Sequence, residues 1–407
     1  MMLDTEFVRA QFPAFSQPSL ADQAFFENAG GSYPCRQVVD RLTGFYTDHK
    51  VQPYYPFLSS QKVGAEMDEA RARLAAMMGV TPDEVSFGPS TTQNTYVLAQ
   101  AFRQWMSPGD AIVVTNQDHE ANSGPWRRLA DDGIEVREWS VDPETGRLDP
   151  ADLEAILDEK VRLVCFPHCS NVVAEINDVA AICATAHMAG AFACVDGVSY
   201  APHGLPNVGE LGPDIYLFSA YKTYGPHQGI MVMRPALNAL LPNQAHYFNA
   251  DVPYKRFTPA GPDHAQVASC AGIADYFDAI YDHHFDGTTD AAEKCAKVSG
   301  LMRQKEVELA QPILTYLAER NSVRLLGPSD AKTRAPTIAV VAKTPAAELA
   351  QALAADNINA GCGTFYGNRV LQAMGEDIDH GALRLSLVHY NTNEEVDRLL
   401  NALDRLL

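Results

Sequence analysis

The sequence predicts an α/β protein with a large domain, in which a mostly parallel sheet is flanked by helices, and a smaller C-terminal α/β domain. Three observations lead to this expectation. The apolar runs 192–195 and 215–218 are short and bounded by turn residues, as buried strands are. Strand and helix patterns alternate along much of the chain. The length of 407 residues is sufficient for two domains.

The elements of the first half follow from local patterns. Residues 1–20 predict a short amphipathic helix that packs near the smaller domain, and 35–79 are mostly helical around a loop rich in Pro and Tyr at 51–60. A strand, a turn and a helix are expected over 80–102. Further strands are expected at 111–114 and at the start of 161–178.

The second half contains the expected boundary between domains. Residues 243–264 lack periodicity and predict a long loop, and helices are expected over 264–322. A strand at 337–341 and the helix after it belong to the smaller domain. We therefore expect a large domain over 21–280 and a small one over 281–407.

Charged residues follow both central strands. Asp196 ends the first apolar run, and Lys222 comes shortly after the second. Ligands of α/β sheets bind beyond the carboxyl ends of the strands. Pyridoxal phosphate needs a lysine amine for its Schiff base and a carboxylate against its pyridine nitrogen. These two residues alone leave a structural ion pair equally open.

The flanking residues carry a family resemblance. VDGVSYAPHG, followed by FSAYKTYGPHQG, resembles the fold-type I, class V aminotransferase family, which includes cysteine desulfurases and selenocysteine lyases. The resemblance spans about residues 20–405 and implies a pyridoxal 5'-phosphate-dependent enzyme with a PLP-dependent transferase-like fold. It implies that Asp196 contacts the pyridine nitrogen, that Lys222 forms the Schiff base, and that Ser219 contacts the phosphate.

The resemblance extends to other cofactor contacts. Residues 90–95, STTQNT, open a helix, where unpaired N–H groups favour an anion, so Thr91 and Thr92 are expected at the phosphate; helix capping alone is the alternative. His119, in DHEAN, matches the histidine that stacks on the pyridine ring and is expected to be catalytic; otherwise it is a solvated loop histidine. Asn171 matches the asparagine near the ring oxygen.

Two expected cofactor contacts differ from the family pattern, and a third is expected to come from a second subunit. Ser199 stands where members often have Gln, and Tyr221 where they often have His. Gly261 loosely matches a Gly-rich segment that reaches the phosphate from the other subunit. The resemblance therefore implies a homodimer with a shared active site.

The substrate residues are expected near both ends of the chain. LRLSLVHYNTNEEVDRL resembles the family ending whose arginine binds an α-carboxylate, so Arg384 is expected to bind an amino acid substrate, because a guanidinium matches a carboxylate with two hydrogen bonds. A surface arginine is the alternative. Asn28 and Gly30 lie in a turn that reaches the active-site mouth in the family; a plain turn is the alternative.

The reaction depends on a thiol that the sequence does not clearly provide. Desulfurases carry a cysteine in an R-x-G-x-H-C-like loop; Cys362 lies in that region, but aligning Gly361 with the motif puts Thr364 at the cysteine position. We expect an enzyme acting at Cα or Cβ of an L-amino acid, like a cysteine desulfurase or selenocysteine lyase. A class V aminotransferase and a PLP-binding protein with little turnover remain alternatives.

Composition limits the partners. The net charge of −20 argues against nucleic acid and anionic membranes, which attract basic surfaces. Eight scattered cysteines without a CxxC pair predict a reducing compartment and no metal site. The first residues lack the apolar core of a signal peptide, and no apolar run is long enough to span a membrane, so we expect a cytoplasmic protein.

Overall fold

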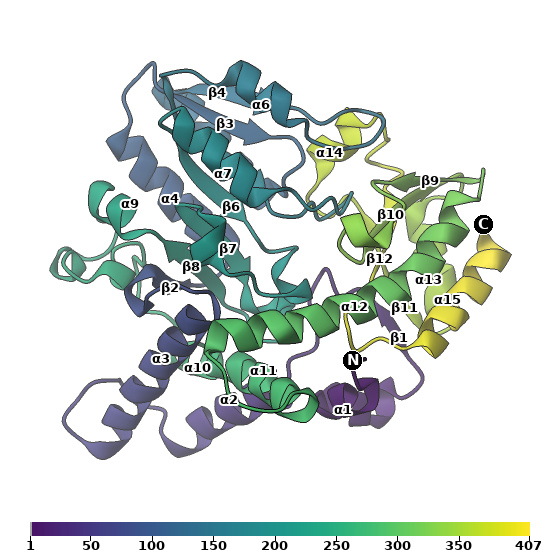
Figure 1. Ribbon diagram of the computed structural model, residues 1–407, viewed down its shortest axis with the longest axis horizontal. Helices are drawn as coiled ribbons and strands as arrows, with labels where there is room; N and C mark the ends of the chain where they lie inside the picture. Colours follow the sequence, from purple (N-terminus) through teal and green to yellow (C-terminus); the bar gives the residue numbers. More distant parts are fainter. Residues whose placement is uncertain (1) are drawn as a thin grey trace.

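The computed structural model describes residues 2–407 and contains two sheets, each covered by helices (Figure 1). The larger sheet has the order β2-β8-β7-β6-β5-β3-β4. Strands β4, β3, β5, β6 and β7 are mutually parallel, and β8 runs antiparallel to β7 and β2. The expected mostly parallel sheet is confirmed. Its strands are β2 (Val85–Gly88), β3 (Ala111–Thr115), β4 (Glu135–Trp139), β5 (Val161–Pro167), β6 (Phe192–Asp196), β7 (Ile215–Ser219) and β8 (Gly229–Met233).

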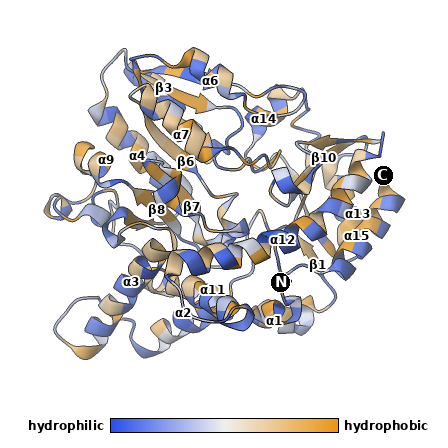
Figure 2. Ribbon diagram, viewed as in Figure 1, coloured by the Kyte–Doolittle hydropathy of each residue, from blue (hydrophilic) through white to orange (hydrophobic). Residues whose placement is uncertain are grey.

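The two central strands end side by side. In the register of β6 and β7, Asp196 pairs with Leu217. All five residues of β7 are buried, because helices cover both faces of the sheet, and this explains its uninterrupted apolar sequence. Figure 2 shows the strands of this sheet mainly in the hydrophobic colour. The carboxyl ends of these strands therefore meet at one edge.

The helices lie around both sheets, and α12 extends from one to the other (Figure 1). It contacts α3 and α11 at one end and α15 and β9 at the other. Helix α3 begins at Leu58, so the expected loop at 51–60 is shorter than predicted. The helices are α1 (Thr5–Ala10), α2 (Arg36–Asp48), α3 (Leu58–Met77), α4 (Thr91–Trp105), α5 (Gly124–Arg127), α6 (Pro150–Ile156), α7 (Val179–Met188), α8 (Val208–Leu211), α9 (Pro235–Leu240), α10 (His264–Ser269), α11 (Ala271–His284), α12 (Ala291–Ala318), α13 (Ala346–Ala355), α14 (Asn368–Ala373) and α15 (Asn393–Leu406).

The smaller sheet contains strands from both ends of the chain. Its order is β1-β11-β12-β10-β9, formed by β1 (Ala24–Phe26), β9 (Val323–Leu326), β10 (Thr337–Ala342), β11 (Ile358–Gly363) and β12 (Ala382–Ser386). β1 pairs with β11 in parallel, whereas the other pairs are antiparallel. The first strand, expected within 21–280, thus belongs to the second sheet. A domain boundary near residue 280 remains a prediction.

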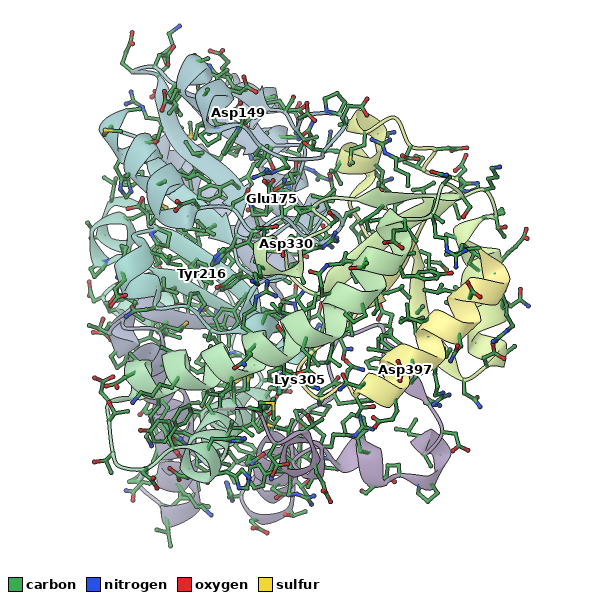
Figure 3. All side chains as sticks on the ribbon, turned by 45° about the vertical axis from the view of Figure 1, so that its right-hand side comes forward. Asp149, Glu175, Tyr216, Lys305, Asp330 and Asp397 are labelled. Carbon is green, nitrogen blue, oxygen red and sulfur yellow. The ribbon has the colours of Figure 1, made fainter. Side chains whose placement is uncertain are left out.

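The two sheets meet through loops at their facing edges. A backbone bridge joins Glu175, after β5, to Arg334, before β10. Figure 3 places the labelled Glu175 and Asp330 at this junction, and Lys305 on α12 below it. Within residues 2–407, no helix is long and apolar enough to cross a membrane.

Candidate active site

Asp196 and Lys222 are buried at the ends of the two central strands. Lys222 lies in a short 3-10 turn, Ala220–Lys222, directly after β7, and Asp196 Oδ1 accepts the Val198 N–H at 2.8 Å. Burial raises the pKa of Asp196 to about 6 and lowers the pKa of Lys222 to about 8. Each charge partly opposes the effect of burial on the other, so the two groups are electrostatically coupled.

The start of α4 lies against the same end of the sheet. Ser90 caps the helix, and Thr91 Oγ1 lies 2.8 Å from Ser219 Oγ. A Cβ on Gly229 would lie 2.6 Å from the Thr91 nitrogen, so only glycine permits this close approach of β8. With Thr92, these groups form a set of hydroxyls and free helix N–H groups that suits a phosphate.

His119 lines a pocket of about 750 Å³ together with Ser90, Thr92 and Tyr221. Its Nδ1 accepts the Ala121 N–H at 3.0 Å. Burial, with the charges of Lys222 and Arg384, lowers the pKa of His119 to about 3. The imidazole is therefore neutral at pH 7, as a ring that stacks on a cofactor would be.

Arg384 completes the site from the smaller sheet. Its Nη1 donates to the Asn171 carbonyl at 3.3 Å, and its guanidinium lies 4.0 Å from the centre of the Phe365 ring. Asn171 Nδ2 donates to the Phe365 carbonyl at 2.7 Å. These contacts join the loop after β5 to the loop after β11. Arg384 is therefore held where loops of both sheets contribute.

Three buried polar atoms in this region have no hydrogen-bond partner among residues 2–407. They are Asn94 Nδ2 at the start of α4, Asn171 Oδ1 and Arg384 Nε. Buried polar groups are nearly always paired, and an orphan group costs about 1–3 kcal/mol. A polar ligand that supplies acceptors to Asn94 and Arg384 and a donor to Asn171 would satisfy all three.

The comparisons with known proteins identify the family. The model of the family described as Aminotransferase class-V matches residues 24–245 and 287–399. The chain belongs to the class V aminotransferase family. One curated relative of the chain is the aminotransferase-like protein FGM3 of Gibberella zeae. It is 32% identical over 99% of this chain and 98% of the relative. A cysteine desulfurase of Yersinia pestis is 29% identical over 100% of this chain and 99% of its own.

Solved structures agree on the fold of this class V enzyme. An apo cysteine desulfurase from Thermococcus onnurineus NA1 superposes with a TM-score of 0.85 at 23% identity, covering 100% of this chain and 98% of its own. The cysteine desulfurase CsdA from Escherichia coli gives 0.82 at 24% identity, with the same coverage. The enzyme depends on pyridoxal phosphate and is similar to cysteine desulfurases.

The residues present fit pyridoxal phosphate. Lys222 and Asp196 would suit its aldehyde and its ring nitrogen, the start of α4 would suit the phosphate, and the neutral imidazole of His119 would suit a flat ring. The unpartnered Asn171 Oδ1 and Asn94 Nδ2 suit polar atoms on the ring and the phosphate.

Other expected residues lie at the margin of the site. Ser199 is half-buried in the turn after β6, and Tyr221 stacks on His227 with ring centres 4.6 Å apart. Gly261 is exposed and lines a different pocket, which does not include His119 or Tyr221. Its contact with the phosphate from a second subunit remains a prediction.

Asn28 has a structural role in this chain. Its Nδ2 donates to the Ser386 carbonyl at 2.8 Å and to the Phe25 carbonyl at 3.1 Å, while Oδ1 accepts from the Tyr390 hydroxyl. The side chain is buried and its hydrogen bonds are already made. A substrate contact by this amide was expected, but the structure uses it to hold the N-terminal strand against the end of β12.

Cys362 faces away from the site. In the register of β11 and β12, Gly361 lies opposite Arg384, and Cys362 lies opposite Leu383. Directly paired residues share a face of the sheet and neighbouring ones alternate. Gly361 therefore shares the face of Arg384, and the thiol lies on the other. The seven remaining cysteines within residues 2–407 are buried and free.

Sequence reasoning missed Glu27 and Phe365. Glu27 Oε1 lies 2.8 Å from Arg384 Nη2. The signal for Glu27 was a charge between an apolar strand and a Gly-Gly turn. For Phe365 no local signal existed: it and Tyr366 have positive φ angles of 56° and 58° that only the folded loop reveals.

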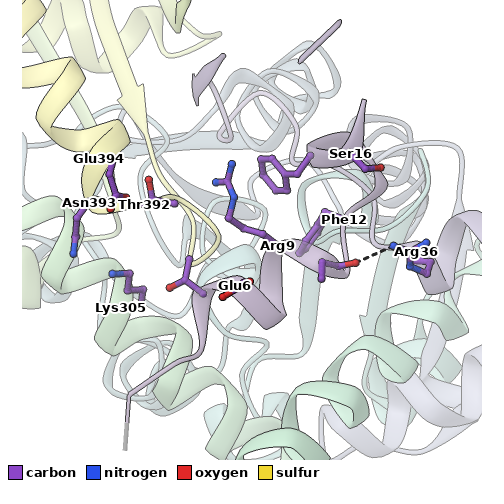
Figure 4. Close-up of a pocket in the computed structure, with 12 residues that line it drawn as sticks. Glu6, Arg9, Phe12, Ser16, Arg36, Lys305, Thr392, Asn393 and Glu394 are labelled. Atoms are coloured by element: carbon purple, nitrogen blue, oxygen red, sulfur yellow. Dashed lines mark hydrogen bonds between the residues drawn. The ribbon is translucent and has the colours of Figure 1, made fainter. Parts of the chain in front are cut away.

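A second pocket lies between α1 and the start of α15 (Figure 4). Its lining includes Arg9, which pairs with Glu395 at 3.0 Å, and Lys305, which pairs with Glu308 at 2.8 Å. Arg36 also lines it and donates to the Ala10 carbonyl, whereas Glu6 and Glu394 have no ion pair within residues 2–407, and we assign this pocket no role.

The lowered pKa of Lys222 gives a prediction for the cofactor-free enzyme. Only the neutral amine adds to an aldehyde, and with a pKa of about 8 it is about one-tenth of the population at pH 7. The rate of reconstitution with pyridoxal phosphate should therefore rise about tenfold per pH unit below pH 8 and level off above it. Stopped-flow absorbance from pH 6 to about 9.5 measures this profile. A rise that continues to about pH 10 would show that the amine keeps its ordinary pKa.

Proposed function

We propose that the enzyme cleaves the bond from Cβ to sulfur or selenium in an L-amino acid and releases the heteroatom directly, without a persulfide on its own cysteine. The similarity to cysteine desulfurases supports cleavage of the bond from Cβ to sulfur or selenium. The orientation of Cys362 supports release without a persulfide. A protein thiolate can accept sulfur only where it reaches the substrate and is activated. Cys362 lies on the wrong face of β11 for this.

The residues would act as follows. Arg384 binds the α-carboxylate through its unpartnered Nε and an Nη group, which orients the Cα–H bond toward Lys222. Bound pyridoxal phosphate supplies an electron sink, and Asp196 keeps its ring nitrogen protonated. The Lys222 amine takes the Cα proton. The Cβ–S bond then breaks, and sulfur leaves with the electron pair. For L-cysteine plus water, the products are pyruvate, ammonia and hydrogen sulfide.

The serine variant of Cys362 tests this route. We expect Cys362→Ser to keep its rate within about twofold of wild type, because a surface thiol outside the site contributes little. L-cysteine and L-selenocysteine are supplied, and pyruvate, alanine, ammonia and sulfide are quantified. A loss of activity in Cys362→Ser, or alanine as the main product, would contradict direct elimination and favour the persulfide route.

Transamination is the second candidate. The family and the relative FGM3 of Gibberella zeae carry aminotransferase names, which support it. The same residues would serve, with Lys222 returning the proton at another carbon. The screen is therefore repeated with keto acid acceptors. A new amino acid formed from the acceptor would favour transamination, and cofactor absorbance that no L-amino acid changes would favour a binding protein with little turnover.

We also propose a homodimer that places Gly261 of each subunit near the phosphate of the other. Aromatic side chains exposed near the same loops support an interface: Tyr54, Tyr55, Phe57, Tyr247 and Phe248.

The free cysteines support a reducing, cytoplasmic location.

A further inference from the structure

Glu27 forms an ion pair with Arg384, the arginine that is expected to bind the carboxylate of the substrate. The side chain of Glu27 is 32% exposed, that of Arg384 only 5%, and Oε1 lies 2.8 Å from Nη2. The residue follows β1, and its backbone forms an isolated bridge with Ser386, two residues beyond Arg384. The pair is therefore local to the site and joins the N-terminal strand to β12.

Two glycines make room for this carboxylate. A Cβ on Gly30 would lie 2.1 Å from Glu27 Oε2 and 2.6 Å from Oε1. A Cβ on Gly361 would lie 3.1 Å from Oε1. Neither glycine has a positive φ angle, so the reason for glycine at position 30 is the space that the Glu27 carboxylate occupies.

Two of the five N–H donors of the guanidinium are used within residues 2–407. Nη2 donates one hydrogen bond to Glu27, Nη1 donates one to the Asn171 carbonyl, and Nε has no partner among residues 2–407. Because Nε carries a single N–H, a substrate carboxylate that makes two hydrogen bonds must engage at least one Nη group, which it then shares with Glu27 or with the Asn171 carbonyl. Two carboxylates on one buried cation would also repel each other. The partly exposed Glu27 can turn toward water, whereas Arg384 is buried and fixed by Phe365.

We propose that Glu27 occupies, in the unliganded enzyme, the position on Arg384 that the substrate's α-carboxylate takes, and that every substrate must displace it. This inference rests on the proposed function of Arg384. Glu27 is thus a specificity-determining residue. It neutralises the Arg384 cation when the site is empty. It also weakens the affinity of every carboxylate ligand, so that weakly binding carboxylates and inorganic anions compete poorly with the substrate.

Glu27→Gln tests the competition in the cofactor-loaded enzyme. Removing the internal carboxylate should lower the KM for the amino acid substrate about tenfold and leave kcat within about twofold. Propanoate, which has a carboxylate but no amine, should bind about tenfold more tightly by calorimetry. A raised KM or weaker propanoate binding would overturn the proposal, since it would mean that Glu27 helps Arg384 to hold its ligand.

Gly30→Ala is an independent variant that keeps the charge. Its methyl group must move the Glu27 carboxylate, so this variant should also tighten propanoate binding and lower KM. Glu376→Gln is the matched control, because Glu376 pairs with Arg324 at 2.6 Å in the same domain, away from the site. The proposal holds only if both site variants tighten propanoate binding and the control does not.

The calorimetric readout separates this inference from the proposed function. Propanoate binding requires Arg384 but no turnover. A wild-type enzyme whose cofactor absorbance ignores every L-amino acid would overturn the proposed function, whatever the propanoate result. Normal turnover with unchanged propanoate affinity in Glu27→Gln would overturn the role of Glu27 alone.

Discussion

Replacing Lys222 with alanine is expected to abolish turnover, with a loss of at least about 10⁴-fold in kcat. In the proposed mechanism the Lys222 amine both attaches the cofactor and moves the Cα proton, and water could not replace a buried side chain in these two roles. Its low pKa of about 8 keeps an accessible neutral fraction at physiological pH. Product formation from L-amino acids measures the loss, and the absorbance of the attached cofactor should disappear with it.

The control for this variant is Lys305→Ala. Lys305 is also a largely buried lysine, with a side chain 11% exposed and an ion pair to Glu308, but it lies on α12 outside the site. It should retain wild-type cofactor content and rate. Lys222→Ala activity above about one per cent of wild type would contradict the assignment of Lys222 as the base.

The central strands and their terminal charges were predictable because each depends on local sequence. Apolar runs such as 192–195 and 215–218 are typical of strands that helices cover on both faces of the sheet, and both runs form such central strands. Asp196 ends the first run and Lys222 follows shortly after the second, so their proximity follows from the adjacency of the two strands. Family resemblance added His119, Asn171 and Arg384, which the fold gathers around them.

Long-range pairing was not predictable from local patterns. The partner of β1 lies more than 300 residues later, so nothing near Glu27 indicates that it will meet Arg384. The direction of the Cys362 thiol depends on the register of β11 against β12, and a shift of one residue would have turned it toward the site. The amide of Asn28 is occupied by β12 for the same reason.

Replacing Asp196 with asparagine is expected to reduce kcat by about 10²–10⁴-fold while the enzyme still folds. A neutral amide cannot hold a proton on the cofactor's ring nitrogen, so the electron sink weakens just where charge develops. The buried carboxylate has a pKa near 6, which means that it is ionised and available at pH 7 and above. Steady-state kinetics and a titration of the cofactor's affinity measure the effect. An unchanged kcat would show that Asp196 has only a structural role at the edge of the sheet.

Asp118→Asn is the matched control for Asp196→Asn, because Asp118 is a second buried carboxyl group that interacts electrostatically with Asp196. Burial raises the pKa of Asp118 to about 8, so it is mainly protonated at pH 7, and an amide of the same shape replaces a neutral acid. Its partners, Thr115 and Asn122, can still bond to the amide. We therefore expect Asp118→Asn to stay within about threefold of wild type at pH 7. A similar collapse in both variants would point to general damage at this end of the sheet, whereas a large loss in Asp196→Asn alone would assign the working negative charge to Asp196.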